Sequence, residues 1–260
     1  MVAGRNATPG LAPVRIVAAH ELVLEQIRTA IMLGRYRPGD CLPPERALAE
    51  FLNVSRTTAR GAIAILADEG LLEIKRGRGG GLFVRETVPV VAQTRRAVQQ
   101  NREQIRQVFE FRITVESACA ALAAERRTQS DLQEMNRLLK AMTALKGPNN
   151  EVPSHPADTA HFHSLDTDLH LAIAKAARNQ WLQDAVLKGR VEMFRPVGAL
   201  FNVLDVTGDY LHDRIVEAIE RQEPDKARQY MTEHIDTTGR IVESWVKAPE
   251  TRAGTVRKRS

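Results

Sequence analysis

The chain has 260 residues, of which 43% are hydrophobic and 27% are charged, and its net charge is +5. Its apolar content is enough for the cores of one large or two modest domains, and its two cysteines lie too far apart to indicate a disulfide framework or a cysteine zinc site. No run approaches the roughly 20 apolar residues of a membrane span and no signal-peptide pattern is present, so we expect a cytoplasmic protein with no membrane partner.

The positive charge is concentrated at the two ends of the chain. Residues 1–86 hold twelve Lys or Arg against nine Asp or Glu, and residues 247–260 hold five against one. The remaining residues, 87–246, therefore carry a net charge of −2. This distribution favours a polyanionic partner for the first part of the chain rather than for the middle.

Three helices are predicted in the N-terminal part, after a flexible leader over 1–14. Helical spacing of apolar residues predicts the first helix over about 15–33. The second helix is expected to begin with Pro44 in its first turn. The third helix is predicted to begin after a cap at Ser55 and to end near Asp68.

A β-hairpin is predicted directly after the third helix. Two short β-like runs, Leu71–Ile74 and Leu82–Val84, flank a tip rich in glycine and arginine. Since the second and third helices are joined by a short turn, they predict a helix-turn-helix. We therefore interpret residues 15–86 as a winged helix-turn-helix domain, whose third helix enters the major groove of DNA while the hairpin reaches the flanking backbone or minor groove.

One face of the third helix consists of cations and small hydroxyls. No acidic residue occurs from Phe51 to Ala67, although a solvated helix face normally mixes both signs of charge. Arginine and hydroxyl side chains are the groups that hydrogen-bond phosphates and base edges. A plain solvated surface is the alternative, and the order of helix, turn, polar helix and basic hairpin disfavours it. We predict binding of double-stranded DNA by this face, namely by Ser55, Arg56, Thr57, Thr58 and Arg60.

The rest of the chain predicts an all-α domain. A polar linker over 87–103 precedes residues 104–246, which carry helical patterns and no strand pattern. One of these helices is expected to open at Ser130, and the segment 146–164 is predicted to be a loop or insertion. Residues 247–260 form a basic tail. The predicted fold class is therefore mainly α, with an N-terminal winged helix-turn-helix and an all-α helical-bundle ligand-binding domain.

Four polar side chains of the second domain share helix faces with apolar residues. Asp166 and His170 are four residues apart and therefore lie on one face of a helix. His212 and His234 each lie eleven residues from Glu223, which sits in the turn between the last two helices, so an antiparallel pair would place both imidazoles at the same height. One carboxylate and three imidazoles suit a borderline divalent ion. We predict a metal site that holds zinc, or else nickel or manganese; the alternative for each histidine alone is a hydrogen-bonded core residue.

Three further polar residues of this domain are candidates for a site, and for Arg112 two interpretations stay open. Arg112 also lies on an apolar face, and a buried cation needs an anion, which is either an internal glutamate or a carboxylate ligand bound through two hydrogen bonds. His161 and His163 lie in the predicted insertion and are interpreted as solvated loop residues.

The two halves of the chain resemble the two domains of one family. The stretches "PGDCLPPERALAE", "VSRTTAR" and "EGLLEIKRGRG" resemble the DNA-binding half of GntR-type bacterial transcription regulators. The stretches "FEFRITVESACAALAA" and "DTDLHLAIAKAARN" resemble the FCD effector domain of the FadR-like branch. The resemblance implies a homodimer that responds to a ligand, usually represses transcription, and binds a short palindromic operator.

Residue roles follow from this resemblance by position. It implies DNA contacts by Arg46, by the five residues of the third helix named above, and by Arg76 and Gly77 in the hairpin; Arg78 is added on its charge alone. The resemblance also agrees with the four metal-ligand positions deduced from spacing.

The resemblance further implies an effector and a function. Arg112 and Asn179 match positions that face the effector in many members, which is typically a small organic acid or sugar acid touching the metal. We therefore predict a transcriptional regulator, most simply a repressor, and no enzyme activity. The alternative is a metal-dependent hydrolase or lyase that uses the same metal site, and the winged domain, which an enzyme would not need, disfavours it.

Overall fold

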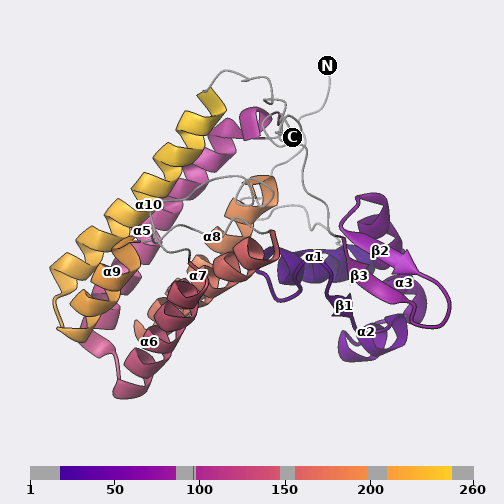
Figure 1. Ribbon diagram of the computed structural model, residues 1–260, viewed down its shortest axis with the longest axis horizontal. Coiled ribbons are helices and arrows are strands. Elements are labelled where there is room, and N and C mark those ends of the chain that lie inside the picture. Colours follow the sequence, from indigo (N-terminus) through magenta and orange to yellow (C-terminus); the bar gives the residue numbers. More distant parts are fainter. Residues whose placement is uncertain (1–17, 86–95, 97, 147–155, 198–209, 248–260) are drawn as a thin grey trace, which may run out of the picture. The chain divides into compact units, whose positions relative to one another are not determined.

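The computed structural model describes residues 18–85, 96, 98–146, 156–197 and 210–247 (Figure 1). By their contacts, the described residues within 1–28 and 41–83 form one compact unit, and those within 29–40 and 84–260 form a second. The predicted leader lies outside the described residues, as do most of the predicted linker and nearly all of the predicted tail. Within the described ranges, no helix is both long and apolar enough to cross a membrane.

The first unit contains the predicted helix-turn-helix and wing. The winged arrangement and the mainly α fold class are thereby confirmed. The strand β1 has only two residues, too few for a visible alternation, and was not predicted from the sequence. The elements are α1 (Ala19–Met32, whose last turn belongs to the second unit), β1 (Cys41–Leu42), α2 (Glu45–Phe51), α3 (Arg56–Asp68), β2 (Leu72–Lys75) and β3 (Gly81–Val84).

The turn between α2 and α3 follows from its residues. Asn53 has φ of 52°, a left-handed conformation that asparagine tolerates better than most residues. The hydroxyl of Ser55 accepts a hydrogen bond from the backbone N–H of Thr58 at 3.0 Å, so the predicted cap is confirmed. Pro44 is the residue before α2 rather than part of its first turn.

The three-stranded sheet forms the wing, with β3 between β1 and β2. β1 and β3 are antiparallel, with Cys41 opposite Phe83. At the tip between β2 and β3, Gly77 has φ of 93°, and a Cβ atom on Gly80 would lie 2.4 Å from the carbonyl oxygen of Lys75. Only glycine fits such positions, so the glycine-rich tip is required for this tight turn.

The core of the first unit is formed by one face of each helix and by the inner face of the sheet. Arg28 on α1 also donates hydrogen bonds at 2.7 and 2.6 Å to both carboxylate oxygens of Glu69, just after α3. This ion pair links α1 to the end of α3. The buried apolar side chains include Val23, Ile27, Leu48, Ala59, Ala62, Ile63, Leu66, Leu72 and Leu82.

The described elements of the second unit are all helices, in agreement with the predicted bundle. α10 runs along α5, and α9 packs against α10, while α7 contacts α5, α6 and α8 (Figure 1). These packed helices are α5 (Arg102–Arg126), α6 (Gln129–Ala144), α7 (Pro156–Ala176), α8 (Gln180–Val197), α9 (Tyr210–Glu220) and α10 (Pro224–Lys247).

Two predicted helix starts are wrong. α6 is capped by Thr128, whose hydroxyl and backbone N–H exchange hydrogen bonds with Asp131, whereas Ser130 lies inside the helix. α7 begins at Pro156, a residue suited to the first position of a helix. The predicted insertion is therefore helical from that point, and His161 and His163 are helical residues rather than loop residues.

Within the second unit, α7 also contacts the turn that follows α1. The Ser164 hydroxyl donates a hydrogen bond to the carbonyl of Gly34 at 3.2 Å, and Arg35 forms an ion pair with Asp168 at 2.6 Å. Gly34 has φ of 70°, and a Cβ atom there would lie 2.6 Å from Cβ of Ser164. The close approach of this turn to α7 therefore depends on glycine at this position.

Candidate functional site

The structure places the predicted DNA-contacting face of α3 on the surface. The side chains of Arg56 and Arg60 are each 66% exposed, and Thr57 is exposed as well. Ser55 is exposed and Thr58 is half-buried, and their hydroxyl oxygens lie 2.8 Å apart at the start of the helix. The face therefore offers the cations and hydroxyls that the sequence predicted.

Acidic residues of α2 pair with these arginines, which the sequence analysis did not predict. Glu45 accepts two hydrogen bonds from Arg60, at 3.0 and 2.9 Å, and lies 3.8 Å from Arg56. Arg46 pairs with Glu50 at 2.8 Å. The hydrogen bonds from Arg60 lower the pKa of the Glu45 carboxyl below its usual value. Exposed pairs of this kind contribute at most about 1 kcal/mol, so a DNA phosphate or base can replace the carboxylate as partner.

The tip of the wing carries the remaining predicted DNA contacts. Arg76, Gly77 and Arg78 are all exposed there, and a tight turn presents them. Exposed basic side chains at a hairpin tip can contact DNA phosphates. This agrees with the role expected for Arg76 from the family resemblance and for Arg78 from its charge.

In the second unit, the structure brings the four predicted metal ligands together. Asp166 and His170 come from α7, His212 from α9 and His234 from α10. Each offers one nitrogen or oxygen atom, and these atoms all lie within 4.8 Å of one another. The ring centroids of His212 and His234 are 4.2 Å apart, so the two imidazoles are at one height on α9 and α10, as their spacing predicted. The three histidines are buried and Asp166 is largely buried.

Two neighbouring side chains hold Asp166 ionised. Arg190 of α8 forms an ion pair with its Oδ2 atom, and His212 Nε2 lies 3.0 Å from its Oδ1 atom. Burial opposes ionisation of this carboxyl, but the charge of Arg190 and the hydrogen bond of His212 outweigh burial and hold its pKa well below 3.8. An ionised carboxylate is the form that binds a metal ion.

The imidazole of His234 is held neutral. Burial lowers its pKa well below 6.5, and the neighbouring His212 and His170 lower it further. The neutral ring is the form that binds a metal ion, so this ligand needs no loss of a proton at neutral pH.

Arg112 has an internal partner, which is the first of the two alternatives left open by the sequence. Its side chain is buried, and its Nε atom donates a hydrogen bond to Glu116 at 2.6 Å. Its Nη1 atom lies 2.7 Å from the sulfur of Met193. The other residue assigned to an effector, Asn179, is half-buried and accepts a hydrogen bond from the backbone N–H of Leu182 at 3.3 Å, so it caps α8.

Two buried charged residues of this region were missed in the sequence. Glu116 lies four residues after Arg112 on α5, and its other carboxylate oxygen hydrogen-bonds His170. Arg190 is 1% exposed and also donates to the hydroxyl of Thr167 at 2.7 Å. The available signal was a charged residue on an apolar helix face, the same signal that singled out Arg112.

The cluster fits a divalent metal ion. Three imidazoles and one carboxylate are the donor types that zinc prefers, at about 2.0–2.2 Å from the ion. His170 Nε2 is buried and finds no hydrogen-bond partner among the residues that the structure describes. A buried polar atom without a partner is costly, and a metal ion would satisfy it. The tight approach of the ligand atoms allows one ion to reach all of them after small shifts.

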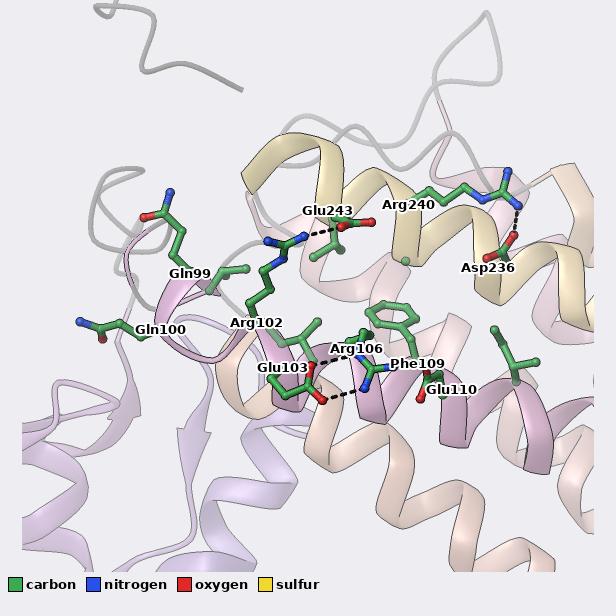
Figure 2. A pocket seen from close by; sticks show the side chains of 15 residues that line it. Gln99, Gln100, Arg102, Glu103, Arg106, Phe109, Glu110, Asp236, Arg240 and Glu243 are labelled. Carbon is green, nitrogen blue, oxygen red and sulfur yellow. Dashed lines mark hydrogen bonds and ion pairs between the residues drawn. The ribbon is translucent and has the colours of Figure 1, made fainter. Parts of the chain in front are cut away.

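A separate pocket of about 620 Å³ lies between α5 and α10 (Figure 2). Its rim carries ion pairs of Arg102 with Glu243 at 2.7 Å and of Arg106 with Glu103 at 2.7 Å, and Phe109 contributes apolar surface. Among its described lining residues none is a predicted site residue. The buried titratable side chains described above therefore belong to the cluster of Asp166, His170, His212 and His234 and its neighbours, and not to this pocket.

Comparison with protein families matches both halves of the chain. Residues 107–237 match the model of the FCD domain, and residues 20–82 match the model described as bacterial regulatory proteins, gntR family. The cluster lies wholly inside the first match, and the exposed face of α3 lies inside the second.

Known proteins similar to this chain include regulators of bacterial operons. It is 28% identical to the Glc operon transcriptional activator of Escherichia coli K12, with 84% of this chain and 86% of that protein covered. It is 32% identical to the Uxu operon transcriptional regulator of the same strain, with 74% and 65% covered. Among solved structures, E. coli McbR/YncC has the same fold at 19% identity, with a TM-score of 0.54 and coverage of 88% and 99%.

Proposed function

The chain belongs to the gntR family of bacterial regulatory proteins with an FCD domain, and from this premise we propose that it is a metal-dependent repressor controlled by a small carboxylate or sugar acid. Membership in the family makes it a transcriptional regulator, and similar proteins are regulators rather than enzymes. The proposal adds the repressor role, the effector, the metal and the homodimer. Because its partner is chromosomal DNA, the proposal also places the protein in the cytoplasm.

The observation that carries the sensing half of the proposal is the buried cluster of Asp166, His170, His212 and His234. A bound zinc ion would supply a Lewis acid that attracts the carboxylate of an effector. These four residues would hold the ion, and zinc can accept a further ligand beside four protein donors. Arg112 shares Glu116 with His170 through its Nε–H, and its other guanidinium N–H groups would pair with the effector carboxylate. Asn179 is kept as a second effector contact.

The coupling to DNA is proposed to pass through α7. This helix carries two of the four ligands, and Asp168 between them pairs with Arg35 within the same compact unit. A shift of α7 on effector binding would therefore strain the turn after α1. In a homodimer on a palindromic operator the half-sites lie at a fixed helical spacing, so a small change in each protomer is enough to weaken operator binding.

We expect Arg60→Ala to weaken operator binding by about 1–3 kcal/mol if Arg60 reads a guanine. The reason is that the exposed guanidinium on α3 exchanges Glu45 for the base edge. If the arginine instead contacts a phosphate, the slope of log affinity against log salt should fall by about 1. Fluorescence anisotropy measures both quantities, with the full-length protein and duplexes that the protein itself selects from a random library.

The matched control is Arg137→Ala, which removes an exposed arginine of α6 paired with Glu134 at 2.7 Å. It should leave affinity and salt slope unchanged. Arg56→Ala provides a second test of the same face, since its side chain is as exposed as that of Arg60. Unchanged affinity and unchanged slope in both α3 variants would rule out this docking of the helix on DNA.

A further inference from the structure

Glu116 hydrogen-bonds both Arg112, which is proposed to bind the effector, and His170, which is proposed to bind the metal. Its Oε1 atom accepts a hydrogen bond from Arg112 at 2.6 Å, and its Oε2 atom hydrogen-bonds Nδ1 of His170. Arg112 lies on α5, as Glu116 does, whereas His170 lies on α7. All three side chains are at most 3% exposed. Water therefore competes little with these two hydrogen bonds, which hold the carboxylate in one orientation.

The hydrogen bond from His170 determines which of its ring nitrogens faces the cluster. An ionised carboxylate can only accept hydrogen bonds, and the guanidinium of Arg112 favours that form of Glu116. In the neutral ring, which is the form that binds a metal ion, the proton therefore lies on Nδ1 and Nε2 carries the lone pair. Nε2 lies 3.6 Å from Asp166 Oδ1 and makes no hydrogen bond within the part of the chain that the structure describes. The free lone pair thus points to the place where the four donor atoms meet.

We infer that Glu116 is a positioning residue, which sets the tautomer and ring orientation of His170 for metal binding and links that ligand to Arg112. Carboxylates that accept the second N–H of a metal-bound histidine orient the ring and raise its basicity. The inference rests on the proposed metal site. It assigns a role to a residue outside the four ligands, and it connects Arg112 to the metal ligand His170 through one carboxylate.

A purely structural role for Glu116 makes a different prediction. If the carboxylate only neutralises Arg112, its loss destabilises the fold but leaves the metal affinity of the folded protein unchanged. Glu116→Gln separates the two roles because glutamine has the same shape and only one acceptor oxygen. When that oxygen serves Arg112, the amide N–H₂ faces His170 Nδ1 and forces the ring proton onto Nε2, where it opposes the metal.

The test is a competition titration of Zn²⁺ between the full-length protein and a chromophoric chelator. Glu116→Gln should bind Zn²⁺ about 10–100-fold more weakly than the wild type. The visible absorption bands of Co²⁺, bound in place of zinc, should also change in position or intensity, because they report the ligand geometry. Glu110→Gln is the matched control: it makes the same substitution at an exposed ion pair with Arg106 on the same helix, and it should change neither quantity.

Each outcome decides the inference. Wild-type Zn²⁺ affinity and an unchanged Co²⁺ spectrum in Glu116→Gln would overturn the role of Glu116 and leave the metal site standing. Absence of Zn²⁺ binding by the wild type would overturn the metal site and this role together. If Glu116→Gln does not fold, the double variant Arg112→Met/Glu116→Leu removes the buried pair and the acceptor for His170 together, which cores tolerate better than the loss of one partner. That variant should still bind Zn²⁺ about 10–100-fold more weakly, and wild-type affinity in it would overturn the role.

Discussion

Replacing Arg190 by methionine is expected to lower the free energy of unfolding of the metal-free protein by about 3–5 kcal/mol. Arg190 is 1% exposed, and its guanidinium is the cation that pairs with Asp166 Oδ2. Methionine fills a similar volume but leaves the carboxylate of Asp166 buried beside the histidines without its main counter-charge. Breaking a buried pair from one side costs far more than removing an exposed one, because the remaining charge stays desolvated.

Denaturant unfolding of the chelated protein measures this loss. Arg137→Met is the matched control, since it breaks an exposed pair with Glu134, and it should cost less than about 1 kcal/mol. Saturating zinc should restore part of the stability lost in Arg190→Met, because a metal ion on Asp166 supplies a new counter-charge. A cost below about 1 kcal/mol for Arg190→Met would contradict the assignment of this ion pair as a support of the cluster.

Removal of metal from the wild-type protein is expected to have a comparably large effect. A ligand that binds only the folded state stabilises it by about 2.7 kcal/mol at 100 times its dissociation constant and by about 4.1 kcal/mol at 1,000 times. A chelator should therefore lower the melting temperature of the purified protein, and added zinc should restore it. A small carboxylate or sugar acid that binds the metal should raise the melting temperature of the zinc form alone.

Variants of two histidines on α7 make this test specific to the cluster. His170→Ala removes a predicted ligand and should abolish the response to chelator and zinc. His161→Ala removes a histidine of the same helix that lies outside the cluster and should keep the wild-type response. The four-residue assignment would be wrong if chelator, zinc and acids all left the wild-type melting temperature unchanged.

Local signals in the sequence predicted most of the first unit. A capping hydroxyl at Ser55 and a glycine-rich hairpin tip each act within a few residues, so they are readable from sequence. The two-residue strand β1 was not readable, because it exists only through its pairing with β3. The pairing of Glu45 with Arg60 was missed for the same reason, since fifteen residues separate the two partners.

The four cluster residues could be predicted because helical spacing carries over long distances. The i, i+4 pair of Asp166 and His170 and the equal distances of His212 and His234 from the turn both translate directly into height on a helix. Glu116 and Arg190 surround that cluster from α5 and α8. The contacts of Glu116 and Arg190 depend on how α5 and α8 pack against α7. The spacing of residues within a single helix does not determine that packing.

The start of α7 shows how composition misled the sequence analysis. Residues 146–164 contain proline, glycine and asparagine, which predicted a loop. Pro156 instead begins the helix, a position where its missing N–H and fixed φ carry no cost. Similarly, Thr128 rather than Ser130 caps α6, because the acid three residues later, Asp131, completes a capping box with it.

If a ligand on the buried cluster controls DNA binding, it must change the affinity of the protein for its operator. The measurement is the dissociation constant of the full-length protein for a selected duplex. It is made by fluorescence anisotropy on the zinc form, with and without an acid that stabilises this form thermally. We expect the acid to change the dissociation constant about 5–150-fold, corresponding to a coupling of about 1–3 kcal/mol, and His170→Ala to abolish the change. Equal affinity with and without an acid that binds the zinc form would contradict this control of DNA binding.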